Sequence, residues 1–222
     1  MDSIKQGREV MSSYTGINQK PNYSIKVEEK FIYDIISQLV DKIMALISLI
    51  IALPFILLVA IAIKLEDGGP ILYSQTRLGK DGRPFTIYKF RSMRIDAEKD
   101  GAQWAQLEDD RITKTGHFIR KTRLDEIPQL YNILAGHMKL IGPRPERPEL
   151  AEEFYKELPD FVNRLAVKPG LTGWAQVNGG YDITPAEKLV LDIEYIENRG
   201  MLLDLKIILK TVGVVFTGDG AR

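Results

Sequence analysis

An adjacent pair of carboxylates, Asp125 and Glu126, follows a basic run that contains Arg120, Lys121 and Arg123. A carboxylate beside guanidinium groups stays ionised, as a nucleophile or a metal ligand must be. Neighbouring residues of a helix point about 100° apart, so the two carboxylates would have different roles. Most adjacent acidic pairs are solvated surface residues, and the pair alone does not define a site.

Several cations could hold phosphate groups near such a pair. Lys89 and Arg91 stand in one short run, and Arg144 lies between two prolines that restrict its backbone. A guanidinium held in place can bind a phosphate through two parallel hydrogen bonds. Taken singly, each of these cations is more often an ordinary surface residue.

A loop expected at 169–174 leads into Trp174, Gln176 and Asn178. These side chains could stack on a flat ring such as uracil and hydrogen-bond to it, although a tryptophan in such a loop more often simply packs. The chain has neither the Walker loop nor the Rossmann glycine fingerprint. The common nucleotide-sugar glycosyltransferase folds are therefore not indicated.

The composition excludes several other kinds of chemistry. The chain has no cysteine, which rules out disulfides, thiolate metal sites and cysteine nucleophiles. It has only two histidines, so a histidine-rich metal site is not expected. Basic and acidic residues number 30 each, so the basic excess typical of nucleic-acid binding is missing. No cleavable signal peptide is recognisable near Met1.

The segment from Ile43 to Ile63 carries no charge and, at about 21 residues, could cross a hydrocarbon core as a helix. A buried helix of a soluble core is disfavoured, because such helices usually carry a polar face. Pro54 lies in the middle of the segment and predicts a kink. Basic residues flank both ends, which suits a helix that returns to the face it entered. On these features alone, a kinked span fits equally well.

The rest of the chain predicts short elements. Two β-rich runs around Asp81-Gly82 indicate a hairpin, and helical spacing interrupted by Pro128 indicates two short helices or a bent one. Thr184 and Glu187 form a capping-box pattern that opens a helix to about Asn198. Further expected elements are a helix and loop within 94–114, a helix at 147–157, and an apolar segment at 201–216 that is too short to span.

Four motifs in one order resemble the bacterial sugar transferase family, the monotopic polyprenol-phosphate phosphoglycosyl transferases that prime capsule, exopolysaccharide and O-antigen synthesis. The similarity runs from about Tyr33 to the C-terminus and is that of the compact form. The motifs are KFRSM at 89–93, RKTRLDEIPQLYNIL at 120–134, LIGPRPERPE at 140–149 and KPGLTGWAQVNG at 168–179.

The resemblance implies an α+β fold, mainly helical with a small β-hairpin, in a monotopic membrane protein on the cytoplasmic face of the bacterial inner membrane. It implies a polar tail at 1–30, a re-entrant helix broken at Pro54 within 31–66, and a catalytic domain with interfacial amphipathic helices at 67–222. Two departures stand out: Leu53 precedes Pro54 where many members have serine, and the sequence at 178–182 lacks an arginine that many members carry.

The resemblance also implies the chemistry. Asp125 would attack the β-phosphate of a UDP-sugar, release UMP and form an aspartyl intermediate, from which undecaprenyl phosphate would take the sugar phosphate. Mg²⁺ would bind at Asp125, and Glu126 would place the metal or assist proton movement. The substrate-binding residues would be Lys89, Arg91, Arg120, Arg144, Gln176 and Asn178.

Two other functions are weighed against this one: a membrane-bound phosphodiesterase or pyrophosphatase that uses Asp125 and Glu126 with a metal, and a non-enzymatic scaffold anchored by residues 43–63. The residues do not select the sugar, although the resemblance around 178–182 leans towards galactose or glucose. The oligomeric state is also open, with a homo-oligomer among the options.

Overall fold

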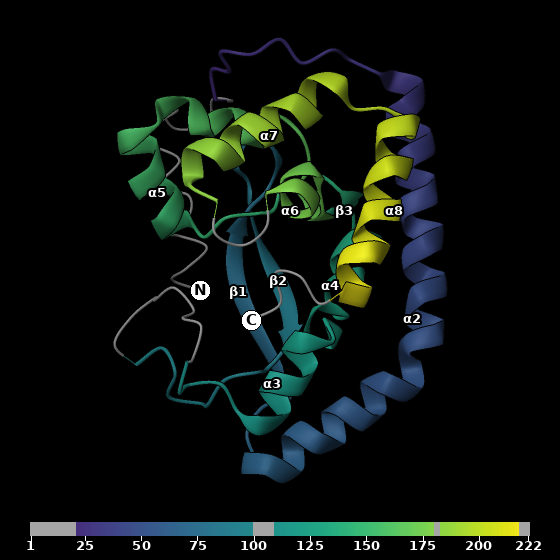
Figure 1. The fold of residues 1–222 in the computed structure, drawn as a ribbon, viewed down its shortest axis with the longest axis vertical. Helices are drawn as coiled ribbons and strands as arrows, with labels where there is room; N and C mark the ends of the chain where they lie inside the picture. The colour runs from purple at the N-terminus through teal and green to yellow at the C-terminus, as the bar shows by residue number, and fades with distance from the viewer. Residues whose placement is uncertain (1–20, 100–108, 180–182, 218–222) are drawn as a thin grey trace.

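The computed structural model describes residues 21–99, 109–179 and 183–217. Its longest element is helix α2, Phe31–Asp67, which runs along one side of the molecule and bends strongly on the way (Figure 1). Pro54 lies inside α2, and the helix continues on both sides of it. The helix therefore bends without being interrupted, and a kink centred on Pro54 stays a prediction.

Helix α2 exposes most of its apolar side chains. In the part of the chain that the structure describes, it is the one helix long and apolar enough to cross a membrane, and 17% of its most apolar window is buried. Leu53 and Leu58, for example, are 58% and 63% exposed. A surface this apolar indicates contact with lipid, and the long apolar helix predicted from the sequence is confirmed.

The predicted hairpin is present. Strands β1, Leu72–Leu78, and β2, Pro84–Phe90, pair antiparallel from Leu72 opposite Phe90 to Leu78 opposite Pro84. The turn between them, Lys80–Gly82, is a short 3-10 segment (η1) in which Asp81 and Gly82 take positive φ angles of 56° and 73°. Aspartate and glycine are residues that tolerate this conformation.

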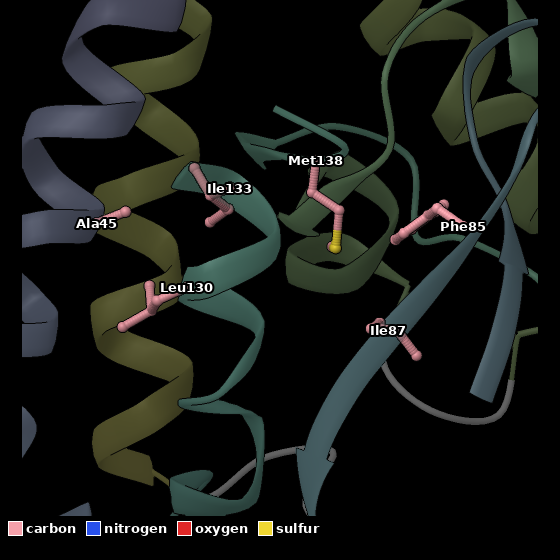
Figure 2. Packing of buried hydrophobic residues seen from close by; sticks show 6 residues of the cluster. All are labelled: Ala45, Phe85, Ile87, Leu130, Ile133 and Met138. Atoms are coloured by element: carbon pink, nitrogen blue, oxygen red, sulfur yellow. The ribbon is translucent and has the colours of Figure 1, made fainter. Parts of the chain in front are cut away.

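The interruption expected at Pro128 is also present. Helix α3, Lys114–Lys121, is followed by the 3-10 turn η2, Leu124–Glu126, and by helix α4, Gln129–Leu134. Helix α4 lies between α2 and β2, and Figure 2 shows the side chains that fill the space. They are Ala45 of α2, Leu130 and Ile133 of α4, Phe85 and Ile87 of β2, and Met138.

A buried asparagine fixes α4 against the sheet. Asn132 accepts a hydrogen bond from the Tyr88 amide (3.2 Å) and donates one to the Thr86 carbonyl (2.7 Å). Its side chain thus pairs with the edge of β2 that β1 leaves free, as a neighbouring strand would. This contact holds η2, which comes just before α4, beside the end of the hairpin.

The loop predicted at 169–174 is only partly a loop. Strand β3, Lys139–Ile141, pairs in parallel with strand β4, Gly170–Thr172, and helix α6, Trp174–Asn178, follows after one residue. The expectation of a loop was wrong because a three-residue strand shows no readable alternation. Its pairing depends on a distant segment of the chain.

We expect Gly170→Ala to lower the free energy of unfolding by about 3 kcal/mol, because overpacking against backbone is poorly relieved. A Cβ atom at Gly170 would lie 2.1 Å from the Gly142 nitrogen and 2.5 Å from the Thr172 oxygen. Urea titration of the purified protein in detergent would measure the loss. Gly213→Ala is the control, since a Cβ there meets nothing within 4 Å; equal destabilisation of both variants would contradict the prediction.

The helices predicted at 147–157 and from Thr184 to about Asn198 are present. Helix α5, Pro148–Glu157, and the 3-10 helix η3, Pro159–Ala166, precede helix α7, Pro185–Asn198, which opens with the expected capping box between Thr184 and Glu187. Helix α8, Met201–Thr217, lies alongside the first part of α2 (Figure 1). The helix expected within 94–114 does not occur in its described parts, 94–99 and 109–113, which form turns and a bridge; 100–108 lie outside the described residues.

Candidate active site

The carboxylate pair lies on the turn η2, and the turn is shaped by its flanking residues. Arg123, just before it, takes a left-handed conformation with φ 59°. Leu124 packs against the apolar cluster of Val59, Phe90 and Ile119. A 3-10 turn advances about 120° per residue, so Asp125 and Glu126 diverge more than on the α-helix that we expected.

Glu126 is held between two cations from different elements. Its Oε1 accepts hydrogen bonds from Lys89 Nζ of β2 (2.8 Å) and from Arg144 Nη2 (2.5 Å), in the segment after β3. Burial alone would raise the pKa of Glu126, but Arg144 and Lys89 outweigh it and hold this pKa well below its usual range. Glu126 is therefore an anion that fixes two cations at the site.

Asp125 is buried, with 8% of its surface exposed. Burial and the Glu126 charge raise its pKa above the ordinary aspartate value, while Lys89, Arg120 and Arg144 act to lower it. The guanidinium groups thus act in the predicted direction, but burial outweighs them. With both carboxylates ionised, these three cations leave one net positive charge for an incoming phosphate.

Whether Asp125 and Glu126 could bind a metal ion depends on the oxygen atoms that they can offer to it. Among the described residues, no group of three or more His, Cys, Asp or Glu side chains lies together. Mg²⁺ often binds proteins through one or two carboxylates and completes its shell with water and substrate phosphates. Because Glu126 Oε1 is engaged by two cations, Asp125 is the carboxylate that fits Mg²⁺.

The segment that carries Arg144 is fixed through its backbone. Arg164 Nη2 of η3 donates to the Arg144 carbonyl (2.8 Å), and Arg77 Nη1 of β1 donates to the Pro145 carbonyl (3.0 Å). The Gly170 amide donates to the Pro143 carbonyl (2.9 Å). The stiff loop predicted here is thus held by hydrogen bonds as well as by its prolines.

A buried ionic network lies behind this segment. Arg164 Nε donates to Asp192 Oδ2 (2.5 Å), and Lys188 pairs with Glu146, which Arg164 also approaches (3.4 Å). Sequence reasoning missed Arg164 and Glu146 as supporting residues. The available signal was Arg164 itself, a single charged residue in the mainly apolar segment 161–167. A charged residue in such a segment is rarely buried unless its charge is paired.

We expect Glu146 to make stability depend on pH in acid. Burial alone would raise its pKa, but Lys188 and Arg164 outweigh burial and lower the pKa to about 2. The unfolded value is about 4.3. A depressed folded pKa stabilises the protein above the unfolded pKa, and this contribution disappears as pH falls from about 4.3 towards 2.

The variant Glu146→Gln should therefore lose about 2–3 kcal/mol of unfolding free energy at pH 7 and show a flatter acid limb. Urea titrations at several pH values between 7 and 3 would measure both effects. Glu153→Gln, a change at an exposed position of α5, is the matched control. A wild-type and a Glu146→Gln protein with parallel pH profiles would contradict the assignment.

The remaining predicted substrate-binding cations lie in two places. Arg120 of α3 is close enough for its charge to act on the pKa of Asp125. Arg91 instead pairs with Asp67 at the end of α2 and donates to the carbonyl of Pro70 (2.6 Å). The contacts of Arg91 are thus with the end of the membrane helix.

The predicted ring-binding residues lie on α6. Trp174 is buried, with Lys206 and Lys210 of α8 at 4.9 Å and 5.1 Å from its ring centre. Asn178 donates to the Trp174 carbonyl (2.7 Å) and accepts from Lys210, and the amide atoms of Gln176 are buried. Across the described residues, no hydrogen bond or ion pair joins α6 to Asp125 or Glu126. The Trp174 side chain is packed in the interior, which was the alternative to ring binding in the sequence analysis. Residues 180–182 of the departing motif lie outside the described residues.

Comparison with known proteins places the sequence in one family. A family model for the bacterial sugar transferases matches residues 32–218. The chain therefore belongs to the bacterial sugar transferase family, as its four motifs predicted.

Curated relatives have names that refer to a lipid phosphate. One from Aeromonas hydrophila, UDP-N-acetylgalactosamine-undecaprenyl-phosphate N-acetylgalactosaminephosphotransferase, is 44% identical over 194 residues, covering 86% of this chain and 46% of the relative. One from Escherichia coli, UDP-glucose:undecaprenyl-phosphate glucose-1-phosphate transferase, is 37% identical over 186 residues, covering 82% and 40%. The chain thus spans less than half the length of these two relatives.

A third relative matches over most of its own length. It comes from Bacillus subtilis and is provisionally named an undecaprenyl-phosphate N-acetylgalactosaminyl 1-phosphate transferase. It is 49% identical over 162 residues, which cover 70% of this chain and 90% of the relative.

Proposed function

We propose that the protein transfers a sugar 1-phosphate from a UDP-sugar to undecaprenyl phosphate, the first step in building an exopolysaccharide, capsule or O-antigen. The observation that carries the proposal is the buried Asp125 beside a carboxylate fixed by Lys89 and Arg144. The names of the relatives supply the two substrates.

The reaction proceeds in two displacements. An Asp125 oxygen attacks the β-phosphorus, and the bond from that phosphorus to the bridging oxygen breaks, so that UMP leaves with the electron pair. An oxygen of undecaprenyl phosphate then attacks the same phosphorus and releases the Asp125 carboxylate. Two displacements replace one difficult step, which is the usual advantage of covalent catalysis.

The cations around Asp125 have distinct tasks. Lys89 and Arg144, held by Glu126, present fixed positive charge to the phosphate oxygens, which gather negative charge as the leaving group departs. Arg120 is a third positive charge close enough to act on Asp125. Mg²⁺, held by Asp125 and the substrate phosphates, would neutralise the diphosphate charge when bound.

The contacts of α2 support a re-entrant helix. Near its start, Tyr33 donates to Asp204 of α8 (2.7 Å), and at its end Asp67 pairs with Arg91. Both ends are thus docked on one body. A helix that crossed the bilayer would carry its ends to opposite faces, so this docking favours entry and exit at the same face, which we take to be the cytoplasmic one.

The lipid acceptor explains the apolar surface. Helix α8 exposes Leu202 (85%) and Leu209 (65%) beside the exposed side chains of α2, while its inner face contributes the buried Ile207. An amphipathic helix of this kind lies at a membrane interface, where a lipid headgroup meets a water-soluble nucleotide.

A screen for UMP release tests the proposal. Wild type would be incubated with UDP-galactose, UDP-glucose, UDP-N-acetylglucosamine and UDP-N-acetylgalactosamine, with and without undecaprenyl phosphate. We expect sustained UMP release only with lipid, and a single burst without it. Sustained release of sugar phosphate without lipid would favour the hydrolase, and full function of Asp125→Asn would favour the scaffold.

A further inference from the structure

The last turn of α2 ends in two adjacent carboxylates, Glu66 and Asp67, and the helix stops at Gly68, which has a φ of 72°. Each carboxylate binds a different part of the catalytic body. The hairpin begins a short way further along the chain, at Leu72.

Asp67 forms a two-point ion pair with Arg91, whose Nη1 donates to Asp67 Oδ2 (2.6 Å) while Nη2 donates to Oδ1. Arg91 also donates to the carbonyls of Pro70 (2.6 Å) and Met93 (3.1 Å). Its side chain is 7% exposed, and that of Asp67 is 29% exposed. A paired guanidinium this well surrounded fixes geometry more firmly than an exposed ion pair does.

Glu66 binds the start of α3. Its Oε1 accepts from the Lys114 amide (2.8 Å) and its Oε2 from the Thr115 amide (3.1 Å). A carboxylate at a helix N-terminus satisfies free amide groups and interacts favourably with the helix dipole. Helix α3 carries Arg120 and leads directly to the turn with Asp125.

The packing between these contacts is apolar. Val59 and Ile63 of α2 lie in one buried cluster with Phe90 at the end of β2 and Ile119 of α3, and Leu124 of η2 packs against them. The end of the helix, the end of the hairpin and the catalytic turn therefore form one packed unit. Figure 1 shows the end of α2 and α3 close together at one end of the molecule.

We propose that Glu66, Asp67 and Arg91 form an exit clamp, which fixes the membrane helix to the catalytic body and so sets the height of Asp125 relative to the lipid surface. The three are positioning residues for the lipid acceptor and do not bind the UDP-sugar. The clamp rests on the proposed function, since a height above the membrane matters only for an acceptor held there.

The two half-reactions respond differently to such a clamp. The UDP-sugar arrives from water and needs only the local arrangement of Asp125, Lys89 and Arg144. The phosphate of undecaprenyl phosphate is held at headgroup depth, so a shift of about 1 Å between helix and body costs about 10²-fold in that step. Loosening the clamp should therefore affect the second displacement.

The test uses the full chain in vesicles of bacterial phospholipid. The variants are Glu66→Gln, Asp67→Asn and the double variant, with Asp67→Glu as the conservative change and Glu153→Gln of α5 as control. The UMP burst without lipid acceptor measures the first half-reaction. Transfer to undecaprenyl phosphate in vesicles, and to a short-chain water-soluble polyprenyl phosphate, measures the second.

We expect the double variant to keep its UMP burst within about twofold of wild type and to lose at least about tenfold in transfer within vesicles. The short-chain acceptor should be used normally, and Asp67→Glu should recover most of the vesicle activity. A burst reduced in parallel with transfer would overturn the clamp, and so would vesicle transfer that stays unchanged.

Two controls keep the result decisive. A thermal unfolding curve separates loss of fold from loss of position, and if the double variant fails to fold, the single variants and Asp67→Glu carry the comparison. A wild-type protein without a UMP burst, or an Asp125→Asn variant with one, would refute the proposed function itself and not the clamp alone.

Discussion

Transfer of sugar phosphate should fall by at least about three orders of magnitude when Asp125 is replaced by asparagine, as it does when other covalent nucleophiles are removed. The asparagine amide has nearly the size of the carboxylate but is too weak a nucleophile to attack phosphorus. Both UMP release and lipid product would be measured, because the two steps share the same residue.

The fold should survive this substitution. Asp125 is buried and its pKa is raised by that burial, so a neutral side chain of the same shape is tolerated there. The unfolding midpoint of Asp125→Asn should therefore match or exceed that of wild type. Retention of more than about a tenth of the transfer rate would remove Asp125 from the role of nucleophile.

The variant Glu126→Gln should reduce transfer by about 10²-fold, because it releases the two cations that face the phosphates. It should also destabilise the protein by about 2 kcal/mol. This is less than the usual cost of removing one partner from a fully buried ion pair, because the Arg144 side chain is 34% exposed. Steady-state kinetics and urea titration would measure the two effects separately.

A double-mutant cycle tests the cause of this loss. If Glu126 acts by fixing Lys89, then Lys89→Met should cost much less in the Glu126→Gln background than in wild type. Glu149→Gln, at a half-buried position in the first turn of α5, serves as a charge-matched control. Additive losses at positions 89 and 126 would mean that the two side chains act independently.

The elements that the sequence predicts well are those with strong local signals. The hairpin follows from two β-rich runs around Asp81-Gly82, the break before α4 from Pro128, and the start of α7 from the Thr184–Glu187 capping box. Strands β3 and β4 lack such a signal, because each has three residues and their pairing joins segments about 30 residues apart.

The site residues likewise include some that the sequence predicts and some that it does not. The resemblance to the family implied that Asp125, Glu126, Lys89 and Arg144 belong to one site, and ion pairs of Glu126 join Lys89 and Arg144 to it. The partner of Arg91 could not be read from the sequence, because Asp67 lies at the end of a helix whose path is set by packing.

Supporting residues were the hardest to predict. Arg164 reaches the Arg144 carbonyl and Asp192 across 20 and 28 residues of chain, and such contacts depend on how η3 packs on α7. The bend of α2 was expected from Pro54, although Leu53 replaces the serine common before that proline.

The most direct test of the account is mass spectrometry of the enzyme after incubation with a UDP-sugar and no lipid acceptor. We predict that a peptide containing Asp125 gains the mass of one sugar phosphate, that the adduct disappears when undecaprenyl phosphate is added, and that Asp125→Asn never acquires it. An unmodified Asp125 peptide in a preparation that is turning over, or an adduct at another residue, would contradict the covalent mechanism.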